Sequence, residues 1–269
     1  MTTITPPEAA APPPAEESGA PMTFFEHLVE LRTRIINSLI AIVLGAFAGV
    51  AVSERVIGWI TRPMLKALSD AHLEQKLVYT NPTGYLNLII TLGVYLGVVL
   101  ASPVVLYQIW LFVAPALYKH ERKAITGFLF STVLLFLSGI AFGYFIMLPY
   151  MLRFLISFKG PVTPLISINE YFDLILLVLL GLGLVFELPI LIFFLSLFGI
   201  VTPKFLWTNF RYAILIIAVV AAIVTPTPDA MTMLIFMAPM VGLYFLGIAV
   251  SAVVTRRRTR RLAAAAEAR

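Results

Sequence analysis

Long apolar segments dominate the chain, and their lengths predict helices that cross a membrane. A helix rises about 1.5 Å per residue, so about 20 apolar residues cross the roughly 30 Å hydrocarbon layer of a bilayer. Six segments in the sequence reach or approach that length. The predicted spans are Ile35–Val52, Tyr85–Val113, Ala124–Tyr150, Tyr171–Val201, Tyr212–Val224 and Ala230–Val254.

Two irregularities shape the predicted fold. Prolines inside the spans remove backbone hydrogen bonds and kink their helices, and curved helices build a concave body. The fifth span offers only about 13 apolar residues, roughly 20 Å of helix, before Thr225–Asp229 interrupts it. We therefore expect an all-α membrane protein of six kinked transmembrane helices in a concave bundle, with the break below the outer head groups. Ordinary tilt around one short helix is the alternative. The prolines are Pro103, Pro149, Pro189 and Pro239.

Composition excludes a soluble protein. Hydrophobic residues make up 60% of the chain, charged residues 12%, and the mean hydropathy is +0.97, whereas soluble domains are about 25% charged. The absence of cysteine excludes a disulfide framework, a thiolate zinc site, an iron–sulfur site and a cysteine nucleophile. We expect no cofactor and no metal.

The positive charges predict the orientation in the membrane. Of the 19 lysines and arginines, 13 lie on the side of the N-terminus, which predicts that both termini face the cytoplasm. The net charge of +5 resides entirely in the tail, residues 255–269. Such a tail is typical of an orientation signal beside lipid head groups, so no nucleic-acid partner is expected.

Three regions follow from these patterns. Residues 1–22 are rich in proline and alanine and predict a disordered arm, which has no basic residue and no apolar stretch and so is not a secretory signal. Residues 23–254 form the six-span membrane domain, and residues 255–269 form a basic cytoplasmic tail.

Glu187 is an acid in the apolar interior of the fourth span. Uncharged residues surround it from Leu174 to Val201, which places it near the centre of the span. A carboxylate costs several kcal/mol there, so the default interpretation is a functional group that faces a cavity or a partner. A protonated glutamic acid that bonds a neighbouring helix and holds the bundle together is the alternative.

Two further acids are expected at the cytoplasmic surface. Thr23 and Glu26 match a capping box, and the apolar stripe that follows predicts an amphipathic helix running into the first span. Glu30 belongs to its polar face, either to bind a ligand or to pair with Arg34 one turn later. Glu121 is the only acid of the first cytoplasmic loop; a local ion pair is the alternative to a site in which Glu30 and Glu121 grip guanidinium groups bidentately.

The sequence contains little that indicates an enzyme. The three histidines, His27, His72 and His120, all lie outside the spans. No HExxH motif, paired intramembrane aspartates or P-loop is present. We therefore expect a protein that is not an enzyme.

Four short runs occur in order along the chain: HLVELRTR at 27–34, LYQIWLFVAPALYKHER at 106–122, FELP at 186–189 and TPTPD at 225–229. Together they resemble the TatC family, the multi-spanning core subunit of the twin-arginine protein translocase. The resemblance covers about residues 23–254 and the same number of spans, whereas the proline-rich arm is outside the family pattern.

The resemblance implies a receptor for twin-arginine signal peptides in a bacterial or archaeal cytoplasmic membrane. With TatA/TatB-type single-span partners, and self-associated in a complex, it would move folded proteins by the proton-motive force. The family pattern assigns peptide recognition to Glu30 and Glu121, with Arg32 and Phe112 in the supporting surface. It assigns a partner-helix contact to Glu187 and functional sensitivity on the outer side to Pro63 and Asp229.

Two other functions remain open on the residues alone. A proton-coupled small-solute carrier would use Glu187 as its proton site. A scaffold protein without a ligand would use the acids only to hold its helices together.

Overall fold

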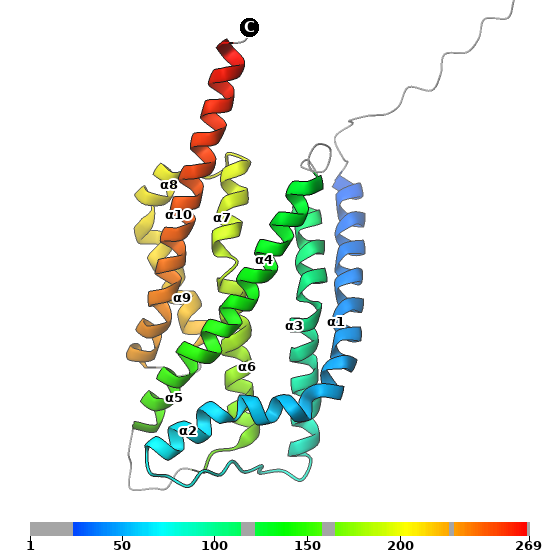
Figure 1. Ribbon diagram of the computed structural model, residues 1–269, viewed down its shortest axis with the longest axis vertical. Helices are drawn as coiled ribbons and strands as arrows, with labels where there is room; N and C mark the ends of the chain where they lie inside the picture. Colours follow the sequence, from blue (N-terminus) through cyan, green and yellow to red (C-terminus); the bar gives the residue numbers. More distant parts are fainter. Residues whose placement is uncertain (1–23, 114–121, 158–164, 226–228, 268–269) are drawn as a thin grey trace, which may run out of the picture.

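The structure, a computed structural model, describes residues 24–113, 122–157, 165–225 and 229–267 (Figure 1). Within these residues it is helical, and an isolated bridge between Val78 and Ser167 is the only strand-like pairing. Five helical segments are long and apolar enough to cross a membrane, and a sixth, Phe210–Val224, is shorter. The predicted all-α membrane class is therefore confirmed, as is the short fifth span. The five long segments are His27–Asp70, Gly84–Phe112, Phe128–Ser157, Ile168–Leu197 and Ala230–Arg256.

The helices share two ends. Figure 1 shows that α1 begins, α3 and α7 finish and α10 leaves the bundle at one end, which we call the Glu30 end. At the other, the α2 end, lie α2, the end of α5 and the beginning of α6. The elements are α1 (Phe24–Ile60), α2 (Arg62–Asp70), α3 (Gly84–Val113), α4 (Arg122–Phe142), the π-helix η2 (Gly143–Met147), α5 (Leu148–Ser157), α6 (Ile168–Val185), α7 (Leu188–Leu197), α8 (Pro203–Thr208), α9 (Phe210–Val224) and α10 (Ala230–Glu267).

The predicted amphipathic segment and first span form one continuous helix, α1. The capping box lies outside what the structure describes, because Thr23 and the side chain of Glu26 are not among the described parts. At its other end α1 turns at Thr61 into α2, a helix that the apolar pattern did not predict. The basic tail likewise continues the sixth span, since α10 runs to Glu267.

Two of the four span prolines interrupt their helices. Pro149 follows the π-helix η2, where the Leu148 N–H donates to the Gly143 carbonyl five residues earlier. Pro189 follows a break at residues 186–187 that divides the fourth span into α6 and α7. A proline cannot donate to the carbonyl one turn before it, which explains both interruptions. Pro103 and Pro239 instead lie inside the continuous helices α3 and α10.

Glycines bring α1 and α3 into close contact. A Cβ added to Gly97 would meet the backbone of Gly45 and Ala46, and one added to Gly49 would meet the carbonyl of Gly93. Small residues four apart on both helices allow such an approach, which in a membrane replaces the missing hydrophobic drive with van der Waals packing. The α1–α3 pair is therefore a tightly fitted unit.

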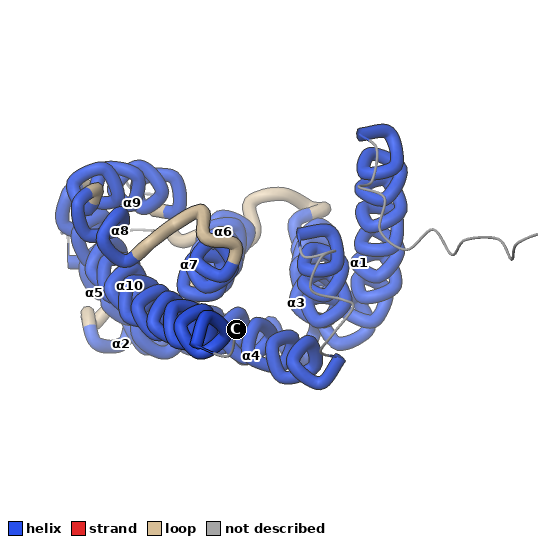
Figure 2. Tube along the Cα trace, turned by 90° about the horizontal axis from the view of Figure 1, so that it is seen from above, coloured by secondary structure: helices blue, strands red, loops and turns tan. Residues whose placement is uncertain are grey.

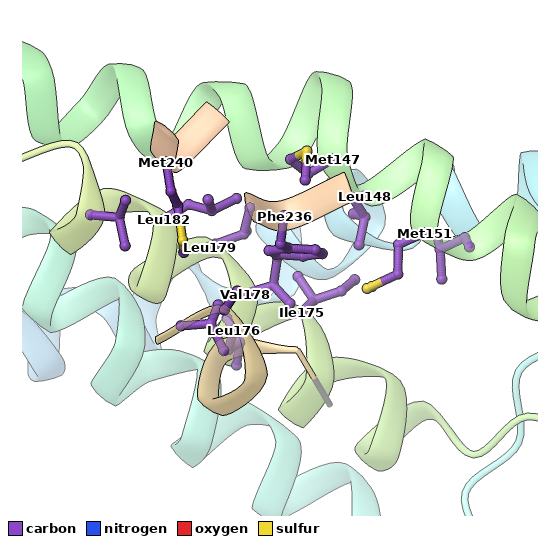
Figure 3. Packing of buried hydrophobic residues seen from close by; sticks show 14 of the residues in the cluster. Met147, Leu148, Met151, Ile175, Leu176, Val178, Leu179, Leu182, Phe236 and Met240 are labelled. Atoms are coloured by element: carbon purple, nitrogen blue, oxygen red, sulfur yellow. The ribbon is translucent and has the colours of Figure 1, made fainter. Parts of the chain in front are cut away.

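The main core is built mostly from α5, α6, α9 and α10, and the end of α1 reaches it through Ile60. Phe172 of α6 and Phe236 of α10 are completely buried, among apolar side chains from α5, α6 and α10 (Figure 3). Viewed along the bundle, α6 and α7 lie between the α1–α3 pair and the group of α8, α9 and α10, while α4 runs along one side (Figure 2). The end of α9 and the beginning of α10 stop short of the level that α2 and α6 reach (Figure 1), as the short fifth span predicts.

Candidate functional site

At the Glu30 end, an ion pair lies within α1 and a hydrogen bond from the same arginine links α1 to α3. The Arg34 Nη2–H donates to Glu30 Oε1 at 3.0 Å, which is the pair expected one helical turn apart. The Arg34 Nη1–H also donates to the side-chain oxygen of Gln108 on α3 at 3.1 Å. Arg34 thus bridges the two helices. The sequence prediction assigned no role to Gln108, although a polar residue near the end of an apolar span was a visible signal.

The ion pair leaves part of Glu30 unused. Its Oε2 atom is buried and accepts no hydrogen bond from any described residue, and Arg34 Nε is buried without an acceptor. A carboxylate oxygen withdrawn from water without a donor is costly. Only 19% of the Glu30 side chain is exposed, so a donor that reached Oε2 would relieve that cost. The arrangement can therefore accept an additional N–H group, and a guanidinium is suited by its several donors.

Aromatic rings flank this pair. The His27 ring of α1 stacks on the Phe112 ring of α3, with centroids 4.4 Å apart and planes at 19°. Phe112 is half-buried in this contact, whereas Arg32 is exposed on α1. Glu30 and Phe112 thus lie on the paired helices α1 and α3. Arg32 is an exposed cation two residues along α1 from Glu30, a spacing that places it on another face of the helix.

Glu121 lies outside the described residues. The residues around it that the structure does describe are Val113, which ends α3, and Arg122, which begins α4. The structure therefore neither joins Glu121 to Glu30 nor separates the two, and their joint action stays a prediction.

Trp110 belongs to a second aromatic group at this end that the sequence reasoning did not predict. Its ring stacks on Phe194 of α7 at 4.2 Å and meets the edge of Phe128 of α4 at 5.1 Å. The indole Nε1 is buried and donates to no described residue. These ring contacts hold α3, α4 and α7 together at this end. Trp110 lies two residues along α3 from Gln108.

Glu187 occupies the break between α6 and α7. Its backbone carbonyl accepts from the N–H groups of Ile190 and Leu191, so the chain restarts as a helix directly after it. Both carboxylate oxygens are buried and have no hydrogen-bond partner among the described residues. The alternative of a bond to a neighbouring helix thus has no partner in the part of the chain that is described. The span runs from Ile168 to Leu197, so Glu187 lies 19 residues from its beginning and 10 residues from its end. Its position is therefore displaced from the centre, where the sequence predicted it, toward the Glu30 end.

The proline and the acid assigned to the outer side, Pro63 and Asp229, occupy different elements. Pro63 lies in the first turn of α2. Asp229 Oδ1 accepts from the Thr232 N–H at 2.6 Å at the beginning of α10, which is the geometry of an N-cap. Asp229 therefore has a structural role in ending the break that follows α9, whatever further role it has.

The fold and these side chains define a class: a multi-spanning helical membrane protein with one unsatisfied carboxylate at its end and another inside a span. A family model described as Sec-independent protein translocase protein (TatC) matches residues 26–239. The chain belongs to the TatC family. TatC is a protein translocase component that works in a complex, so the family is one of transport proteins and not of enzymes.

Several relatives and solved structures agree with this assignment. A Sec-independent protein translocase protein TatC of Koribacter versatilis is 48% identical over 254 residues, which cover 94% of each chain. One of Aquifex aeolicus is 35% identical over 88% of this chain and 98% of the relative. A solved structure described as the twin arginine translocase receptor TatC superposes with a TM-score of 0.75 at 35% identity, covering 86% of this chain and all of the other. These proteins are translocase components and do not support the small-solute carrier.

Proposed function

We propose that the chain is the receptor subunit of a twin-arginine translocase and binds the paired arginines of signal peptides at the Glu30 end. The observation that carries this proposal is the buried, unsatisfied Oε2 of Glu30 next to an arginine that already occupies Oε1. The family and the solved receptor of similar fold support the same ligand.

Recognition follows from the geometry of the guanidinium group. A peptide arginine donates to Glu30 Oε2 while Arg34 keeps its bonds to Glu30 Oε1 and Gln108. Charge-assisted hydrogen bonds of this kind are shorter and stronger than neutral ones, and a lysine cannot reproduce the planar fork. Glu121 binds the second arginine, Phe112 supplies an apolar surface for the peptide, and Arg32 contributes to the surrounding surface.

The remaining assignments complete the transport function. Glu187 contacts the membrane helix of a TatA/TatB-type single-span partner, because a buried carboxyl group without a partner among the described residues is available to a polar group on an added helix. The complex moves folded proteins out of the cytoplasm using the proton-motive force. The Glu30 end, with both termini, faces the cytoplasm, as the excess of lysine and arginine on that side favours.

Binding of a fluorescent twin-arginine signal peptide to the full-length protein in detergent micelles tests this function. A hydrogen bond to a charged group contributes about 1.5–3 kcal/mol, so Glu30→Gln should weaken binding about tenfold or more. Glu121→Gln should do the same, and a peptide with two lysines should bind the unaltered protein weakly.

Glu54→Gln is the matched control, because Glu54 is an exposed acid of the same helix near the α2 end. This variant should bind the peptide as tightly as the unaltered protein. Unchanged affinity in a variant that lacks both Glu30 and Glu121 would overturn the proposed site.

A further inference from the structure

A cluster of positive side chains at the α2 end is not used by the proposed receptor function. Helix α2 buries Met64, Ala67 and Leu68 against the core. Arg62 and Lys66, four residues apart, are exposed on the helix, and residues at this spacing share one face of a helix. Helix α2 lies across the end of the bundle (Figure 1). Its buried apolar residues and exposed cations make it an amphipathic helix.

These cations line a cavity of about 210 Å³ between α2, η2 and α5. Arg153 of α5 closes it on the other side and pairs with Asp70 at 3.4 Å. Among the described residues, no acid lies within ion-pair distance of Arg62 or Lys66. The cavity thus holds an excess of positive charge and favours an anion.

A second cavity, of about 260 Å³, continues from the first along the membrane-spanning helices. Every side chain that lines it is apolar or aromatic, from α1, α3, α4, η2 and α6. Trp59 and Phe145 belong to this lining and are nevertheless exposed, with 62% and 69% of their surfaces accessible. A groove of this composition suits an alkyl chain and offers nothing to a polar solute.

The two cavities meet at Tyr144 and Phe145, which line both. The Tyr144 hydroxyl donates to the Trp59 carbonyl at 2.7 Å and so fixes η2 against the end of α1. The Arg62 guanidinium lies 5.8 Å from the centre of the Trp59 ring, within the range of a cation–π contact. The positive cavity is therefore held at the end of the apolar groove.

We propose that this pair of cavities binds an anionic phospholipid of the adjoining leaflet. Its phosphate and anionic head group lie against Arg62, Lys66 and Arg153, and an acyl chain lies in the apolar groove. Charge complementarity selects the anionic head group, and the depth of the apolar groove selects a lipid over a free phosphate. Pro63, which begins α2 and lines the positive cavity, holds the cations in this position. The proposal does not depend on peptide binding at the Glu30 end.

Native mass spectrometry of the full-length protein, with added dioleoyl phosphatidylglycerol or dioleoyl phosphatidylcholine, measures the head-group part of the proposal. The unaltered protein should retain phosphatidylglycerol in preference to phosphatidylcholine. The double variant Arg62→Gln/Lys66→Gln leaves the Arg153–Asp70 pair intact and should weaken phosphatidylglycerol binding about fivefold for each cation removed. Arg55→Gln/Lys76→Gln removes the same charge outside both cavities and should have no such effect.

Ala141→Phe measures the acyl-chain part, because Ala141 is an exposed lining residue of the apolar groove. It should reduce phosphatidylglycerol binding severalfold and leave the unfolding temperature unchanged, and millimolar inorganic phosphate should fail to displace the lipid. Equal affinity for the two lipids, or unchanged binding in Arg62→Gln/Lys66→Gln, would overturn the proposal. Displacement by phosphate together with full binding in Ala141→Phe would identify a free-phosphate site and overturn it equally.

Discussion

At the scale of single residues, the molecule is distinguished by carboxylates that are buried and incompletely bonded. Glu30 uses one oxygen for Arg34 and leaves the other without a described donor, and both oxygens of Glu187 are in that state. A bundle gains nothing by burying such groups, because an unsatisfied polar atom destabilises the fold. Their presence is explained if ligands or partners complete their hydrogen bonds.

Replacement of Glu187 tests whether its carboxyl group contacts a partner helix or instead stabilises the fold. Glu187→Leu removes two unsatisfied oxygens, so the unfolding temperature in detergent should stay the same or rise. Crosslinking of a single-span partner helix to the variant should fall severalfold. Loss of folding, with the partner contact retained in the folded fraction, would contradict this account.

Ser196→Ala is the matched control on the same span. The Ser196 and Ser251 hydroxyls are buried and bonded at 2.7 Å between α7 and α10. Loss of this one hydrogen bond in Ser196→Ala should cost about 1 kcal/mol of stability and lower the unfolding temperature, while partner-helix crosslinking stays unchanged.

Sequence reasoning found the acids but not their partners. Glu30, Glu121 and Glu187 stand out because lipid topology does not favour carboxylates at those positions. The bond from Arg34 to Gln108 joins residues 74 positions apart, and periodicity within one helix contains no information about the register between two helices. Glu187 lies closer to the end of its span than predicted, because the helix ends at Leu197 and not at Val201. The end of a helix depends on backbone geometry, which hydropathy does not record.

At the scale of elements, the contact between α1 and α3 determines the geometry of the Glu30 end. Hydropathy gave both spans correctly, since a run of apolar residues is sufficient to predict a membrane helix. It did not give α2, which is short, half polar and begins at a proline. It also did not identify the glycines that let α1 and α3 approach, although Gly45, Gly49, Gly93 and Gly97 form two small-residue pairs spaced by four.

A methyl group at Gly97 should disturb both packing and binding. Its Cβ would meet the backbone of Ala46 and Gly45, which cannot rotate away. We expect Gly97→Ala to lower stability by about 1–3 kcal/mol and to weaken peptide binding, because the bond from Arg34 to Gln108 requires the present separation of the helices. Thermal unfolding and the peptide-binding assay measure the two effects.

Gly58→Ala provides the comparison within α1. A Cβ at Gly58 meets no atom within 4 Å, so this change should leave peptide binding intact and stabilise the helix slightly. If Gly97→Ala behaved in the same way as Gly58→Ala, the proposed role of the close α1–α3 contact would be wrong.

At the scale of the whole molecule, the two ends have different chemistry. The Glu30 end carries the unsatisfied carboxylate and the arginine-rich extension of α10, and the α2 end carries the cationic cavity. The class of fold followed from composition and span length alone. The difference in chemistry between the ends did not, because it depends on how α2 packs across the end of the bundle against α5.

The absence of cysteine from the sequence makes the orientation directly measurable. Glu74→Cys introduces a single thiol in an exposed loop at the α2 end, and Arg256→Cys introduces one on α10 beyond the Glu30 end. A membrane-impermeant maleimide should label Glu74→Cys in intact cells and Arg256→Cys only after permeabilisation. The reverse pattern would contradict a cytoplasmic Glu30 end.

The central claim, that Glu30 grips an arginine of the signal peptide, is tested most directly by a double-mutant cycle. Peptide affinity is measured for the unaltered protein and for Glu30→Gln, each with the twin-arginine peptide and with a peptide in which one arginine is glutamine. If the two groups touch, the losses should be non-additive, with a coupling energy of about 1 kcal/mol or more. Additive losses for both peptide arginines would contradict the claim.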